Sequence, residues 1–127
     1  MTKDLIYVQY PTTDETQSVS SAKIVKSTVD PDNGVTIKGA LANKNNTLVV
    51  LVENDGSASN ITFVAGNVYP NAMLGSLTQP VSGESITAFQ IQDPSRFERK
   101  DGSIDLEFDS GFTGSIYAVA KSTALNV

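Results

Sequence analysis

The sequence predicts an all-β protein, an antiparallel β-sandwich or small barrel of about seven to eight strands. Three observations predict this fold class. Apolar and polar residues alternate with period two in many short runs, turn-forming Gly, Pro, Asn and Asp residues separate these runs, and no helical pattern exceeds about two turns. A chain of 127 residues amounts to a single domain.

Residues 1–20 fit this core least well. We expect a strand over residues 4–10, ended by Pro11, and a loop or linker over the polar segment 11–21. We therefore divide the chain into an N-terminal arm or edge strand, residues 1–20, and a β-sandwich domain, residues 21–127. An arm would pair with a neighbouring protein, whereas an edge strand would stay within the domain.

The next part of the chain predicts strands joined by tight turns. Residues 22–29 alternate and predict a strand, and the turn DPDNG at 30–34 leads to another strand at 35–38. Its Asn-Gly pair supplies the positive φ that a tight hairpin needs. Residues 48–53 are apolar on both faces and predict a central strand. With the turn NDGSASN and the run 61–64, they predict the strongest hairpin in the sequence.

The middle of the chain is less regular. Residues 68–81 contain two Pro and a Gly, which predicts a crossing loop with a short edge strand near 76–78. A strand is expected over 85–92. Asp93 and the proline after it end this strand, and residues 95–100 are expected to form one helical turn.

Two strands close the predicted fold. Residues 104–108 alternate strictly, so Ile104, Leu106 and Phe108 are expected in the core. The side chains expected in water beside them are those of Asp105, Glu107 and Asp109. In the last strand, 114–121, one face is expected to carry Ile116, Ala118 and Ala120, and the other Tyr117 and Val119.

Composition excludes several classes of function. The chain has no His and no Cys, so Ser-His-Asp and Cys-His catalysis and thiolate metal sites are excluded, and we expect no metal and no cofactor. The net charge is −5 and the basic residues are scattered, which argues against nucleic-acid binding. The longest apolar run is far too short to span a bilayer and the N-terminus has no signal-peptide pattern, so we expect a soluble protein made in the cytoplasm.

The densest charge lies in the segment QDPSRFERKDGSIDLEF, residues 92–108, which holds three basic and five acidic residues. If Phe97 packs beneath this segment, Arg96 is held in place and can donate a fork of hydrogen bonds to an internal carbonyl or to a partner protein. Arg99 beside the acids indicates local ion pairs. The candidate partner-binding or structural corner therefore consists of Asp93, Arg96, Phe97 and Arg99.

Other candidate sites are weaker. The carboxylates Glu98, Asp105 and Glu107 could provide the acid and base of a glycosidase, but alternation places them on a solvated face, and we assign no catalytic residue. Asp30 and Asp32 lack the spacing of a calcium loop and are expected in a hairpin turn.

Four stretches share a pattern with a known family. They are NNTLVVLVENDGSASNITFVAGN, LGSLTQPV, ESITAFQIQDPSRFERKDGSIDLEF and FTGSIYAVA, which fall within residues 34–121, about two-thirds of the chain. Their order of strands, their Gly-x-Leu loop, their Asp-x-x-Arg-Phe corner and the closing strand resemble the small β-sandwich head decoration, or cement, proteins of tailed bacteriophages. Asp93, Arg96 and Phe97 match the corner of this pattern.

The resemblance implies a non-enzymatic virion protein, made in the host cytoplasm, that binds the outer surface of a phage head and stabilises it. Its partner would be the major capsid protein or another virion protein, and a homo-oligomer such as a trimer would be expected. The alternative is a carbohydrate- or receptor-binding module of a phage tail or cell surface. Exposed Tyr7, Tyr10 and Tyr69 on one face would favour that alternative.

Overall fold

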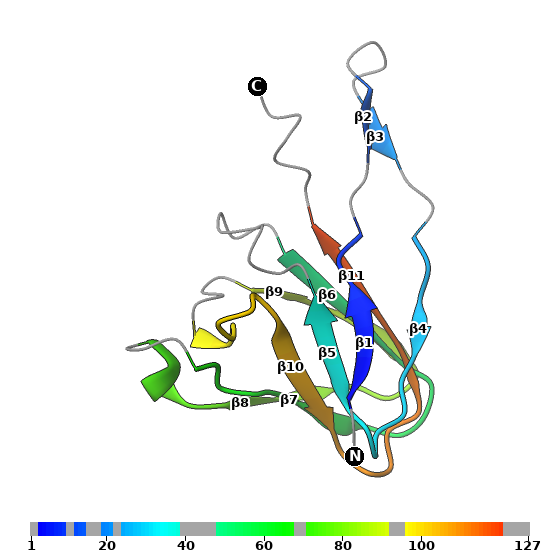
Figure 1. Cartoon of the computed structure of the whole chain (residues 1–127). Helices are drawn as coiled ribbons and strands as arrows, with labels where there is room; N and C mark the ends of the chain where they lie inside the picture. Colours follow the sequence, from blue (N-terminus) through cyan, green and yellow to red (C-terminus); the bar gives the residue numbers. More distant parts are fainter. Residues whose placement is uncertain are drawn as a thin grey trace.

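The computed structural model of the chain is all-β, as the sequence predicts, and describes residues 3–9, 12–14, 19–21, 24–38, 48–67, 71–91 and 96–120. Within these ranges there is no α-helix, and nine strands form two sheets (Figure 1). The five-stranded sheet has the order β1 (Asp4–Tyr7), β5 (Val35–Lys38), β10 (Ile104–Phe108), β7 (Ser59–Phe63) and β8 (Leu77–Val81). The four-stranded sheet has the order β4 (Ser27–Thr28), β11 (Gly114–Ala120), β6 (Leu48–Asn54) and β9 (Ser85–Gln90).

The two sheets enclose one apolar core, which makes the fold a β-sandwich. Alternate residues of each strand point inward, so β6 buries Leu48, Val50 and Val52 while its other residues are half-buried. The five-stranded sheet contributes Ile37 and Leu106, both fully buried. Phe63 of that sheet meets Phe89 of the other edge-to-face, with ring centroids 5.3 Å apart.

The N-terminal segment pairs with both sheets. β1 lies at the edge of the five-stranded sheet, parallel to β5, whereas the other strand pairs within the two sheets are antiparallel. Two residues beyond β1, the backbone of Gln9 accepts a hydrogen bond from Ala120 N and donates one to Ala118 O, so it is joined to β11. Residues 4–9 thus cross from one sheet to the other along one side of the sandwich.

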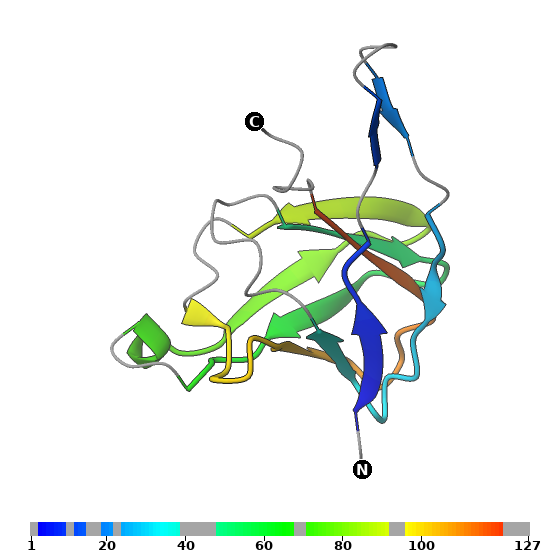
Figure 2. The same ribbon diagram turned by 45° about the horizontal axis from the view of Figure 1, so that its top comes forward.

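The loop expected over 11–21 is wrong in part, because it contains a two-stranded ribbon. β2 (Thr12–Asp14) pairs antiparallel with β3 (Val19–Ser21), and the ribbon projects beyond the two sheets (Figures 1 and 2). The two strand sequences, TTD and VSS, hold a single apolar residue, so no apolar-polar alternation indicated strands there.

Neither predicted hairpin before residue 64 exists. The turn at 30–34 has the predicted positive φ, 72° at Gly34, and a β-carbon there would lie 2.8 Å from Leu106 O. However, β4 before it belongs to the four-stranded sheet and β5 after it to the five-stranded sheet. The turn therefore carries the chain between sheets, and the described part of the strand expected over 22–29, residues 24–29, contains only β4 as a strand.

The second wrong hairpin is the one predicted around NDGSASN. β6 and β7 lie in different sheets, because the buried amide of Asn54 turns the chain across the sandwich. The Asn54 side chain donates to Ser57 O (2.9 Å) and Ser82 O (3.2 Å) and accepts from Gly56 N (3.0 Å). These bonds join the start of β7 and the turn between β8 and β9 to the end of β6.

The later strands follow the predictions more closely. η2 (Asn71–Leu74) and β8 fall in the predicted crossing loop, with an edge strand longer than expected, and β9 lies within the predicted 85–92. The predicted core residues of β10 are buried, as are Ile116, Ala118 and Ala120 of β11. Asp105 was expected in water, but only 8% of it is exposed, because β10 is the central strand of its sheet and neighbouring side chains cover it.

Candidate partner-binding corner

The corner lies between β9 and β10. Arg96 stands in a short 3-10 turn, and the chain then doubles back, with Glu98 bridging Ile104. Arg99 N donates to Ser103 O at 2.7 Å, and Gly102, at φ 85°, donates to Arg99 O at 2.8 Å. Of the segment 95–100, for which one helical turn was expected, Arg96 has 3-10 conformation, while Glu98 belongs to a β-bridge and residues 99 and 100 enter the tight turn. Asp93 lies outside the described residues.

Arg96 and Phe97 anchor the corner to a neighbouring loop. Phe97 is buried and its ring lies 5.7 Å from that of Phe63, while the Arg96 guanidinium stands 5.1 Å above the Phe97 ring. Arg96 Nε donates to Gly75 O at 2.9 Å and Nη2 to Leu74 O at 3.3 Å. The fork of this arginine therefore holds the carbonyls between η2 and β8.

A close backbone contact adds to this anchor. Gly66 N donates to Arg96 O at 3.0 Å, and Asn67 N donates to Glu98 O at 3.3 Å. A β-carbon at position 66 would collide with the Glu98 carbonyl, so this approach requires glycine. The segment after β7 and the corner are consequently packed backbone to backbone.

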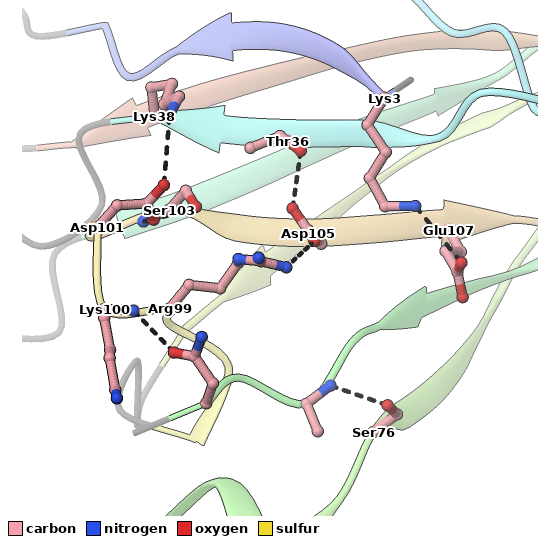
Figure 3. A network of polar contacts seen from close by, with 12 residues as sticks. Lys3, Thr36, Lys38, Ser76, Arg99, Lys100, Asp101, Ser103, Asp105 and Glu107 are labelled. Carbon is pink, nitrogen blue, oxygen red and sulfur yellow. Dashed lines mark hydrogen bonds and ion pairs between the residues drawn. The ribbon is translucent and has the colours of Figure 1, made fainter. Parts of the chain in front are cut away.

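Arg99 belongs to a polar network on the outward face of the five-stranded sheet (Figure 3). Its Nη1 donates to Asp105 Oδ2 at 3.0 Å, and Thr36 Oγ1 donates to Asp105 Oδ1 at 2.7 Å. Both oxygens of this buried carboxylate thus have a partner, one of them charged. Asp105 connects β10 to β5 and to the corner, and this use is structural.

Asp101 holds the tip of the corner. It accepts hydrogen bonds from Ser103 Oγ (2.6 Å) and Ser103 N (3.0 Å), and Lys38 Nζ lies 3.5 Å from it. The Ser103 hydroxyl first, then the Ser103 backbone N–H and the Lys38 charge, lower the pKa of Asp101 to about 2. Lys100 N in turn donates to Asn67 Oδ1 at 2.8 Å, so the tip is tied down on two sides.

Two of the acidic residues that could serve a glycosidase, Asp105 and Glu107, pair with basic side chains. Asp105 is held by Arg99 and Thr36, while Glu107 on the same strand pairs with Lys3 at 3.5 Å. Glu107 and Lys3 border a polar hollow of about 420 Å³. Among the described residues, no group of three acidic side chains is placed to hold a metal ion. Those residues also include no helix long and apolar enough to cross a membrane.

An apolar hollow beside the corner was not predicted. It measures about 340 Å³ and lies between the edge strands β8 and β9, next to Arg96. Its described lining consists of Phe63, Leu74, Leu77, Gln79, Phe89, Gln90, Ile91, Arg96 and Phe97. These residues come from separate segments of the chain, so no local sequence pattern could have brought them together.

The tyrosines that would favour a sugar-binding face are only partly described. Tyr7 on β1 is 68% exposed, and Tyr117 on β11 is half-buried. Tyr10 and Tyr69 lie outside the described residues. Comparison of this chain with protein-family models, with curated proteins and with solved structures gave no match.

Proposed function

We propose that this protein is a non-enzymatic virion component that decorates and stabilises a phage capsid by binding its outer surface. The observation that carries the proposal is the β2–β3 ribbon, which projects from a rigid sandwich (Figure 2). A decoration protein must reach from one capsomer to the next, and such an element extends the reach of the fold without enlarging its core.

The base of the ribbon is clamped to the four-stranded sheet. The side chain of Gln9, just before the ribbon, donates to Val25 O at 2.8 Å and accepts from Val25 N at 2.9 Å, just after it. The backbone of Gln9 is itself paired with β11. Force applied to the ribbon is therefore transmitted to a long interior strand, which suits a protein that resists capsid expansion.

Co-sedimentation with expanded capsids tests this proposal. The full chain should pellet with capsids assembled from the major capsid protein of the encoding phage. A variant with residues 12–21 replaced by a Gly-Ser linker of equal length should bind at least about tenfold more weakly and unfold at an unchanged temperature. Failure of the full chain to bind capsids or any other virion part would refute the proposal.

A carbohydrate- or receptor-binding module is the second candidate, and the exposed ring of Tyr7 favours it. A glycan array separates the two candidates, because a sugar-binding module should give signals that Tyr7→Ala removes. Silence on the array together with capsid binding supports the decoration role. Light scattering of the full chain tests the expected homo-oligomer, of which a trimer is one form, because it should give a multiple of the monomer mass.

A further inference from the structure

On the outer edge of β9, no described strand pairs with the backbone groups of Ile86 and Ala88. Ile91 N donates to Leu48 O, which makes residue 91 a position that bonds to β6. Such positions recur at every second residue of an antiparallel strand, so residues 89, 87 and 85 also bond towards β6. The N–H and C=O groups of Ile86 and Ala88 therefore point away from β6. Within the described part of the chain, β9 has β6 as its strand partner and no strand on its other side.

The other edges of the two large sheets carry protective features that β9 lacks in the described part of the chain. β8 carries Pro80, β4 has two residues, and β1 has four residues, with Lys3 just before it and Asp4 as its first residue. These are the devices by which proteins prevent unwanted strand pairing. β9, with the sequence SITAFQ, has six residues without charge or proline, and Ile86 is 61% exposed. A strand with these properties is suited to accept another.

The apolar hollow lies along the same edge. Phe89 on β9 and Leu77 and Gln79 on β8 point into it, because they face the inside of the sandwich. The turn at Ser82–Glu84 joins the two strands at one end, and the hollow is lined at the other by Ile91 and Arg96. A strand added beside β9 would turn every second side chain into this space.

The positive charge of Arg96 in the lining of the hollow indicates that the bound segment carries an acidic side chain. Arg96 is the charged residue among the described lining, and its hydrogen bonds go to the neutral carbonyls of Leu74 and Gly75. No carboxylate of the described residues pairs with it. An inward-facing acidic side chain of an added strand would supply that charge, although the chain as a whole carries a net charge of −5.

We propose that the β9 edge and the apolar hollow together form a binding site for an extended segment of another protein. The segment adds to β9 as an antiparallel strand, with its backbone paired to Ile86 and Ala88. Its inward side chains are apolar, except for an acidic residue near its N-terminal end, which lies beside Arg96. This inference does not depend on the virion role, because it concerns the isolated chain and a peptide.

The test is an NMR titration of the full chain with the acetylated, amidated peptide TDTVTVK, whose Lys lies on the opposite face from its Asp. Its Asp and both Val residues share one face, as the site requires. We expect the amide signals of Ile86 and Ala88 to shift and their hydrogen exchange to slow. The matched peptide TNTVTVK should bind about fivefold more weakly to the natural chain and equally well to Arg96→Gln, which isolates the charge contact.

Two variants distinguish binding at this site from nonspecific binding of the peptide. Ala88→Lys places a charge on the exposed edge and should weaken peptide binding at least about tenfold. Thr78→Lys makes the same change on the outward face of β8 and should leave binding within about twofold. Absence of any shift at Ile86 and Ala88 at millimolar peptide would refute the site. A doubled mass without peptide that Ala88→Lys abolishes would replace the foreign segment with a second copy of this chain.

Discussion

The two sheets differ in what occupies their outward faces. On the five-stranded sheet, Asp105 at the centre is bound by Arg99 and Thr36, and the rim carries further polar contacts (Figure 3). On the four-stranded sheet, Leu51 is flanked by Tyr117 on one side and Ala88 on the other. Apolar residues therefore occupy the centre of one outward face and a charged network the centre of the other.

This difference indicates which side of the molecule is available to a partner. The polar groups of the five-stranded sheet satisfy one another, and no buried side-chain nitrogen or oxygen among the described residues lacks a hydrogen-bond partner. The four-stranded sheet leaves apolar area in contact with water, holds the base of the ribbon through Gln9 and ends in the unprotected strand β9. We therefore expect partner contacts on the side of the four-stranded sheet.

Replacing Asp105, at the centre of the polar outward face, should cause the largest loss of stability. Asp105→Ala leaves Arg99 and Thr36 without their acceptor and should lower the free energy of unfolding by about 2–3 kcal/mol, measured by urea denaturation. Glu107→Ala on the same strand is the control, because its exposed pair with Lys3 contributes less than about 1 kcal/mol. Equal losses in the two variants would show that the buried network does not stabilise the sheet.

The second-largest loss of stability is expected from replacing Asn54. Asn54→Ala removes three side-chain hydrogen bonds at the point where β6 leaves the four-stranded sheet, and should cost about 2 kcal/mol. Asn60→Ala is the matched control, since its exposed amide makes one described bond, to Asp109. If Asn54→Ala lowered the free energy of unfolding by less than about 0.5 kcal/mol, the role assigned to the Asn54 side chain would be contradicted.

The outward apolar face should matter little for stability. Leu51→Thr keeps a residue suited to a strand and is expected to change the free energy of unfolding by less than about 1 kcal/mol. It should nevertheless reduce binding of the fluorescent apolar dye ANS, because it removes exposed apolar area. Undiminished dye binding would show that the half-buried residues around Leu51 do not form an accessible patch.

The smallest expected effect is the loss of the stabilisation by Asp101 at low pH. The pKa of Asp101 is lowered to about 2 in the folded chain, from 3.8, so the unfolded chain binds its proton first as the pH falls. The stabilisation from Asp101 is therefore complete above pH 4 or so and is lost as the pH falls towards 2. In thermal melts, the difference in melting temperature between the natural chain and Asp101→Asn should shrink as the pH falls from about 4 towards 2. A difference that stays constant from pH 5 to pH 2 would contradict the assignment.

The sequence predicted the fold class and most strands, because period-two alternation is a local property. It did not predict which strands pair. NDGSASN has the composition of a hairpin turn, yet Asn54 uses its side chain to send the chain across the sandwich. Asp105 was misplaced for a related reason, since alternation gives the face of a residue but does not show that Arg99 and Thr36 will cover it.

The candidate corner was accessible to sequence reasoning because its residues are neighbours in the chain. Arg96 was expected to bind an internal carbonyl or a partner, and it binds the carbonyls of Leu74 and Gly75. A partner at this corner stays a prediction. The apolar hollow and the clamp formed by Gln9 depend on contacts between distant segments, so no spacing in the sequence could indicate them.

The measurement that tests the account most directly is capsid co-sedimentation of two surface variants. Leu51→Lys places a charge on the outward face of the four-stranded sheet, and Thr62→Lys places one on the outward face of the five-stranded sheet. We expect Leu51→Lys to bind expanded capsids at least about tenfold more weakly than the natural chain, and Thr62→Lys to bind within about twofold. Loss of binding in Thr62→Lys alone, or no binding by the natural chain, would contradict the account.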